Sequence, residues 1–77
     1  MNKARRKELG KAAELIQQAK ELIEQCMDEE QEAYDNLPES LQYGERGMVM
    51  EEYIGLMDES MDDLDSIVDT IEGIIEA

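Results

Sequence analysis

Apolar residues recur in both halves of the chain at alternating steps of three and four, which places them along one side of a helix. In the first half the series is Leu9, Ala12, Ile16, Ala19, Ile23, Cys26, Glu30, Ala33 and Leu37, broken only by the glutamate. In the second half it is Met50, Ile54, Met57, Met61, Leu64, Val68, Ile71 and Ile75. The pattern predicts two long helices, over about 3–36 and about 47–76.

Residues 37–46 form the predicted connector, because Pro38 and Gly44 interrupt a regular helix. One short helical turn fits within it. Folding the chain back at this point pairs the two series, with small residues opposite large ones, for example Ala19 with Leu64. We therefore expect an all-α fold, one domain over 1–77 built as an antiparallel helical hairpin. Two glycines inside the second helix, Gly55 and Gly73, predict close helix approach or a kink.

Seven further apolar residues flank the two series and would stay uncovered in a hairpin. They are Leu15 and Leu22 beside the first series, Tyr53, Ile67 and Ile74 on one side of the second, and Val49 and Leu56 on its other side. A chain of 77 residues is too short for a large core, and a single cysteine with no histidine excludes internal disulfides and most metal staples. We predict a homodimer, a four-helix bundle, with the first five of these residues at its interface.

Charge and composition limit the classes of molecule that the protein is expected to bind. The net charge of −14 disfavours nucleic acid and anionic membranes as direct partners and favours a protein with a basic surface. No apolar run is long enough for a membrane span, so we expect a soluble protein of the bacterial cytoplasm. Catalysis is not expected, since Cys26 has no histidine partner and is predicted to be a small core residue. The acids of 58–65 lack the spacing of a calcium loop, so neither metal nor cofactor is predicted.

Six carboxylates of the second helix advance by steps of four and three and therefore share one face. This acidic ridge consists of Asp58, Asp62, Asp65, Asp69, Glu72 and Glu76. Ten acids and no cation follow Gly47, so no i,i+4 counter-ion neutralises the row. We predict that the ridge lies opposite the apolar series and imitates the phosphates of DNA. The alternative is an acidic face that serves only solubility.

The cations cluster at the start, where Lys3, Arg5, Arg6 and Lys7 would lie beside the end of the second helix. We expect them to pair with Asp69, Glu72 and Glu76, within one chain or across a dimer. The connector region also contains Tyr34, Tyr43 and Arg46, which either cap the bundle or bind a ligand. Together with Arg5 and Arg6 they form an alternative site for a small nucleotide.

The run DEEQEAYDNLPESLQYGERG, from Asp28 to Gly47, resembles that of a short acidic protein recurring in phages and prophages of Gram-positive bacteria. The resemblance extends loosely over the chain and implies a viral or mobile-element setting. Small non-enzymatic proteins in that setting block host defences by contact, by imitating DNA or by sequestering a signalling nucleotide. Three hypotheses follow: an acidic inhibitor of a host protein, an oligomeric nucleotide sponge, and a helical structural or assembly protein.

Overall fold

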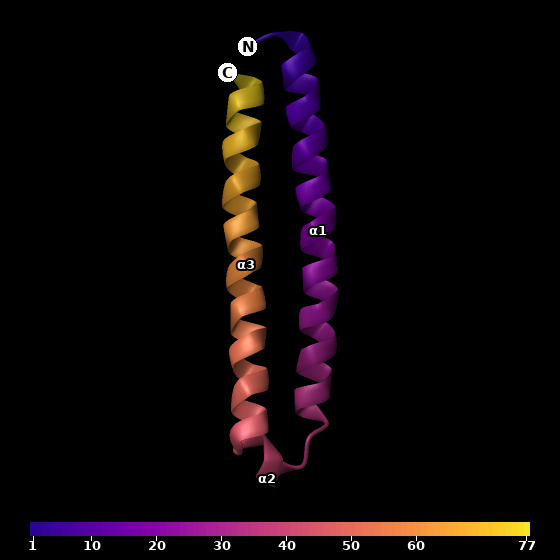
Figure 1. Ribbon diagram of the computed structural model, residues 1–77, viewed down its shortest axis with the longest axis vertical. Helices are drawn as coiled ribbons and strands as arrows, with labels where there is room; N and C mark the ends of the chain where they lie inside the picture. The colour runs from indigo at the N-terminus through magenta and orange to yellow at the C-terminus, as the bar shows by residue number, and fades with distance from the viewer.

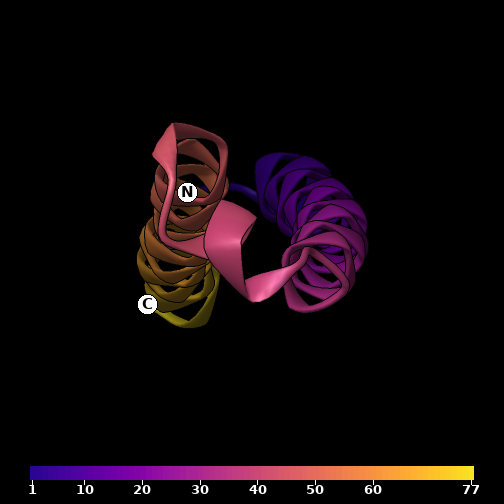
Figure 2. The ribbon, with the colours of Figure 1, turned by 90° about the horizontal axis from the view of Figure 1, so that it is seen from below.

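The computed structural model describes residues 1–77 and contains only helices and the turns that join them. The helices are α1 (Lys3–Asp35), α2 (Glu39–Gln42) and α3 (Glu45–Glu76). The long helices α1 and α3 lie side by side and run in opposite directions (Figure 1). Seen along the long axis, α2 lies across the end at which the chain turns (Figure 2). The prediction of an all-helical protein is confirmed.

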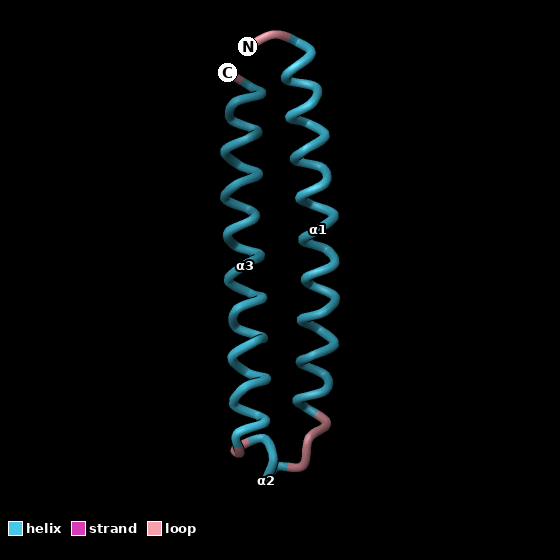
Figure 3. The backbone as a smooth tube through the Cα atoms, in the orientation of Figure 1, coloured by secondary structure: helices cyan, strands magenta, loops and turns pink.

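Local signals set the helix ends, and the non-helical residues are confined to the two ends and the bend (Figure 3). The Asn2 side chain caps α1 by accepting a hydrogen bond of 2.8 Å from the Arg5 backbone N–H. At its other end α1 stops at Asp35, shortly before Pro38. The last helix starts at Glu45, two residues before the expected position, because Gly44 adopts the extended backbone of an N-cap. Glu45 suits the first turn, since a carboxylate is favourable at a helix N-terminus.

The inner side of α3 follows the predicted series throughout, from Met50 to Ile75. The inner side of α1 follows a different series, at 6, 9, 13, 16, 20, 23, 27, 30, 34 and 37. The two series together form the contact seam. Alternate members of the observed series on α1 agree with the predicted series, including Leu9, Ile16 and Ile23. Between these shared members, each seam residue lies one position later in the chain than predicted.

Ala19, Cys26 and Ala33 were predicted in the seam and are exposed instead. Lys20, Met27 and Tyr34 take their places. The larger side chains remove more apolar area from water, worth about 25 cal/mol for each Å². A lysine also fits a seam position, because its aliphatic stem packs while its ammonium group reaches the edge. The expected small-on-large layers at these three positions therefore do not form, and Cys26 is not a core residue.

The bend is held by Gln42 and Gly47. The Gln42 side-chain amide donates to the carbonyl oxygens of Tyr34 (3.1 Å) and Leu37 (3.2 Å), which lie at and just beyond the end of α1. Gly47 is buried, and a Cβ there would lie 2.1 Å from the Gln42 carbonyl oxygen. A glycine is therefore required where α2 meets the first turn of α3. Asn36 is the C-cap of α1, and Pro38 is the N-cap of α2, where no side chain supplies a capping hydrogen bond.

The glycines inside α3 do not mark close helix approach, which was one of the two alternatives expected from the sequence. A Cβ at Gly55 or Gly73 would meet no heavy atom within 4 Å, and both residues are exposed. Their positions explain this result, because neither belongs to the contact seam.

The core between the two long helices is thin. Only Ala13, Gly47 and Val68 are buried. The molecule measures 58 × 14 × 12 Å, so it is one helix thick in one direction and two helices wide in another. Most apolar side chains are therefore half-buried at best, and several large ones are exposed.

Candidate functional site

The acidic ridge flanks the contact seam and does not lie opposite it, which corrects the sequence prediction. Each ridge residue comes one position after a seam residue of α3, as Asp58 follows Met57 and Asp69 follows Val68. One residue turns an α-helix by about 100°. The ridge therefore points to one side of the helix pair, close enough to α1 for Asp65 to contact it.

The same displacement on α1 gives a second acidic row that the sequence analysis did not identify. Residues one position after the seam of α1 include Glu14, Glu21, Glu24, Asp28 and Asp35. Because the two helices run in opposite directions, a displacement of the same sign turns both rows to the same side of the pair. We call this side the acidic face, made of the ridge, Glu51 and these five residues. The correct seam on α1 would have revealed it from the sequence.

Most of the exposed apolar residues of the two long helices occupy the other side. They come one position before the seam on both helices: the exposed Leu15, Ala19, Leu22, Cys26 and Ala33 and the half-buried Ala12 on α1, and Val49, Tyr53, Leu56, Ile67 and Ile74 on α3. We call this side the apolar face. The five residues predicted at a dimer interface all lie on it. Val49 and Leu56 were expected on the other flank of α3, but they belong to the same face.

The exposure of these side chains is high for residues of their type. Leu15 is 63% exposed, Leu22 is 64% exposed and Tyr53 is 55% exposed. The small residues of α1 form the row nearer the seam, and leucines form the outer row. On α3 the nearer row holds the larger residues, including Ile67 and Ile74. The protein thus has two chemically distinct sides, one acidic and one apolar, separated by the seam.

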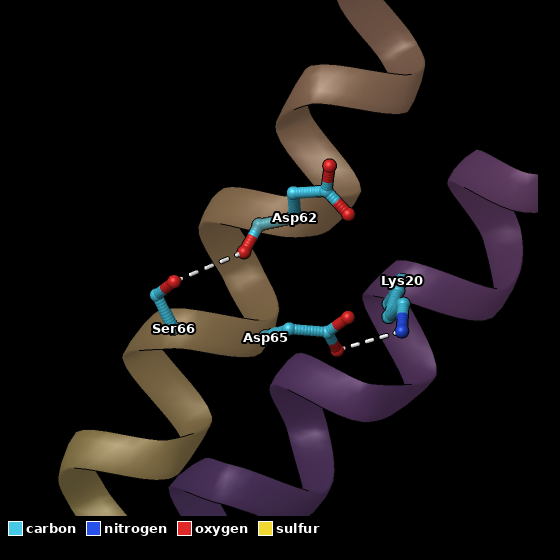
Figure 4. Close-up of polar contacts among 4 residues, drawn as sticks. All are labelled: Lys20, Asp62, Asp65 and Ser66. Atoms are coloured by element: carbon cyan, nitrogen blue, oxygen red, sulfur yellow. Dashed lines mark hydrogen bonds and ion pairs between the residues drawn. The ribbon is translucent and has the colours of Figure 1, made fainter.

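One ion pair crosses from α1 to α3. The Lys20 ammonium group donates a hydrogen bond of 2.6 Å to the Asp65 carboxylate (Figure 4). This hydrogen bond raises the pKa of Lys20 above its ordinary value. Asp62, one turn earlier on α3, forms no ion pair, and only its backbone carbonyl accepts a hydrogen bond, from the Ser66 hydroxyl (Figure 4). Asp65 is therefore the one ridge residue with a counter-ion, and the other five remain free to meet a partner.

The cations at the start of α1 do not form the predicted pairs within one chain. Arg6 donates a hydrogen bond of 2.8 Å to the Ala77 carbonyl oxygen, and Lys11 pairs with Glu8 on its own helix. Asp69, Glu72 and Glu76 are in no ion pair. The role of Arg6 in this structure is to join the two ends of the chain, and pairing across a dimer remains a prediction.

The residues of the alternative nucleotide site are not brought together within one chain. Tyr34, Tyr43 and Arg46 lie near the bend, whereas Arg5 and Arg6 lie at the opposite end of the molecule (Figure 1). Tyr34 is half-buried in the seam, where the nearby Glu51 carboxylate of α3 raises its pKa to about 12. Arg46 forms no ion pair. Tyr34 thus belongs to the seam between α1 and α3.

The Lys20–Asp65 ion pair and the Tyr34 phenol near Glu51 both depend on a protonated group, so alkaline pH should weaken the fold. The pKa of Tyr34 is raised from 10.0 to about 12, so the fold favours the protonated phenol below pH 10 and loses this stabilisation as the pH rises through 12. Lys20, whose pKa is also raised, acts in the same direction. We expect the thermal midpoint, followed by circular dichroism, to fall between pH 10 and 12. The fall should be smaller in Tyr34→Phe, and an equal fall in both proteins would contradict the assignment.

Metal sites, surface hollows and membrane-spanning helices are further features that would bear on function. No group of three or more Cys, Asp or Glu side chains is arranged to hold a metal ion. One surface hollow, of about 300 Å³, is lined by Met1, Arg5, Glu8 and Leu9 and continues the apolar face at the start of α1. No helix combines the length and the apolar content of a membrane span. Comparison with protein-family models, with curated proteins and with solved structures gave no match.

Proposed function

We propose that the chain is a non-enzymatic binding protein that acts as a homodimer, in which two helical hairpins form a four-helix bundle. The total exposed surface of the chain supports this proposal. A compact monomer of 8.8 kDa exposes about 4,800 Å² by the scaling of surface with mass. This chain exposes 5778 Å², about 1,000 Å² more. A typical interface buries about 800 Å² on each partner, so a second copy on the apolar face accounts for the excess.

The acidic face is then the surface left for a different partner. We infer that it binds the basic groove of a nucleic-acid-binding host protein and thereby inhibits a host defence in the cytoplasm of a bacterial cell. The observation that carries this proposal is the convergence of two acidic rows on one side of the helix pair. Neighbouring carboxylates on a helix row lie about 5–6 Å apart, and packed helices about 8–10 Å apart. Such an array presents negative charge at spacings that a phosphate-binding groove accommodates.

The test distinguishes binding through the acidic face from attraction that depends only on the net charge of the protein. Replacing Asp58, Asp62 and Asp69 by lysine reverses three of the five free ridge residues and spares Asp65, the partner of Lys20 in the ion pair between α1 and α3. Immobilised protein would capture partners from a Gram-positive host, and competition with duplex DNA would show whether a captured protein uses its DNA site. We expect the triple variant to lose at least 100-fold in affinity for that protein while its helix content stays unchanged.

The matched control reverses three acids on the outer sides of the helices, Glu32, Glu52 and Glu59, all of them exposed. Both triple variants change the net charge from −14 to −8, since each substitution adds two charges. The control should retain most of the affinity. Equal losses in the two variants would mean that charge alone governs binding, and unchanged binding in the ridge variant would overturn the proposal.

The nucleotide sponge has less support. Its candidate residues lie at opposite ends of one chain, and Tyr34 is half-buried in the seam. Its three cations, Arg46 and the more distant Arg5 and Arg6, are few for a polyanionic ligand. Titration calorimetry of the purified protein with cyclic dinucleotides tests this alternative, for which no heat is expected.

A further inference from the structure

The geometry points to a specific orientation of the second copy: the two chains pack apolar face to apolar face with their bends at opposite ends. This inference rests on the proposed homodimer and adds its arrangement. Two copies of one face can meet symmetrically in two ways. Either the two-fold axis runs along the molecule and the bends lie together, or the axis crosses the molecule and each bend lies beside the chain ends of the other copy.

The charge distribution along the molecule distinguishes the two arrangements. Residues 28–57, which form the bend end, contain nine acids and one cation, a side-chain charge of −8. Residues 1–18 and 67–77, which form the other end, contain five cations and five acids, a charge of zero. Bends placed together would set two clusters of −8 side by side, within a few Debye lengths. Bends placed apart put each acidic cluster beside the neutral, cation-rich end of the other chain.

Packing on the apolar face favours the same arrangement. The Lys20–Asp65 contact fixes which residues of α1 and α3 share a level along the axis. With the bends together, α1 of one copy packs on α3 of the other at that same level. Leu22 would then face Asp63, and Leu56 would face Glu29. Each leucine would be buried against an ionised carboxylate, which is unfavourable.

With the bends apart, α1 packs on α1 of the second copy. Its apolar row alternates small and large residues, Ala12, Leu15, Ala19, Leu22 and Cys26. Two such rows running in opposite directions interdigitate, with Leu22 against Ala19 and Leu15 against Cys26. Small residues opposite large ones let two helices approach closely. In this arrangement neither Leu22 nor Leu56 faces a carboxylate, and Asp63 lies near the two-fold axis, where it meets Asp63 of the second copy in the outer row of the face.

Distances between spin labels test the orientation. In a Cys26→Ser background, a label at Ser40→Cys marks the bend, on the exposed residue Ser40 of α2. Bends apart predict a label separation of about 50 Å or more, since the bend lies about 20 residues from the middle of α1 at 1.5 Å per residue. Bends together predict about 20 Å, two interhelical spacings. A short distance would overturn the inference and leave the dimer intact.

The control label at Gln18→Cys, on the outer side of α1 near its middle, separates failure of the orientation from failure of the dimer. Both arrangements predict a distance of roughly 20–30 Å for this label, because it lies close to the two-fold axis. A long distance at Ser40 with a short one at Gln18 supports the inference. Absence of a dipolar signal from both labels would show a monomer, and the proposed homodimer would then fall together with its orientation.

Discussion

Replacing Leu22 by glutamate is expected to convert the proposed dimer into a monomer. Leu22 is 64% exposed in a single chain, so an isolated chain should tolerate the change with little loss of stability. In the dimer the same side chain is covered by the second copy, and an ionised carboxylate there lacks a partner. With two such sites in each dimer, we expect the dissociation constant to rise at least 100-fold, about 2.8 kcal/mol. Sedimentation equilibrium measures this constant directly.

The control for this variant is Gln18→Glu, which adds the same charge to the outer side of the same helix. It should leave the dissociation constant within a few-fold of the parent value. The thermal midpoint should separate the two variants as well, because a single chain has three buried residues and would gain apolar burial from the second copy in the proposed dimer. If both variants keep the mass and the midpoint of the parent protein, the apolar face is not an interface.

The second large effect is expected at the bend. Gly47→Ala places a methyl group 2.1 Å from the Gln42 carbonyl oxygen, a contact that only a shift of the backbone relieves. Such a shift would separate α2 from α3 and disturb the hydrogen bonds that Gln42 makes to the end of α1. We expect a loss of about 2 kcal/mol or more in the free energy of unfolding, measured in urea at one fixed protein concentration.

Gly55→Ala provides the opposite outcome in the same helix. It introduces a methyl group into open space and should stabilise the protein by up to about 1 kcal/mol through helix propensity alone. The pair therefore tests whether Gly47 is required by its surroundings. Stabilisation by both substitutions would show that the backbone of the bend is not packed against α3 as described.

Most of the fold can be predicted from the sequence. The exception is the rotation of α1 about its own axis, which decides which of its residues face α3. On α3, large residues such as Met57 and Leu64 form a single series, so periodicity alone identifies its inner side. On α1 two overlapping series share Leu9, Ile16 and Ile23 and differ by one residue in the other layers. Local pattern cannot separate them, because contacts with α3 decide between them. The Lys20–Asp65 pair is one such contact.

This rotation also explains how much of the candidate surfaces was predictable. The spacing of the acidic ridge identified its residues correctly, since they all belong to one helix. Its direction relative to the seam was wrong, and the acids of α1 were not recognised as its neighbours. The predicted interface residues depend on the same rotation, yet they agree with the apolar face because Leu15 and Leu22 are large and outside either series.

The proposed function requires one face of the protein for self-association and another for binding a partner, and the apolar and acidic faces are separate surfaces. Self-association through the apolar face leaves both acidic faces outward, on opposite sides of the bundle. A partner protein would then meet carboxylates that the dimer does not occupy. The seam residue Lys20 is paired with Asp65 within the chain, so the other acids of the acidic face keep their negative charge.

The mass of the unmodified protein in solution tests the central claim most directly. Sedimentation equilibrium over a range of micromolar concentrations should give 17.6 kDa, twice the 8.8 kDa of one chain. That result means that a second copy covers the apolar face. A mass of 8.8 kDa throughout the range would mean that the apolar face stays exposed in the isolated protein, and the proposed homodimer would be contradicted.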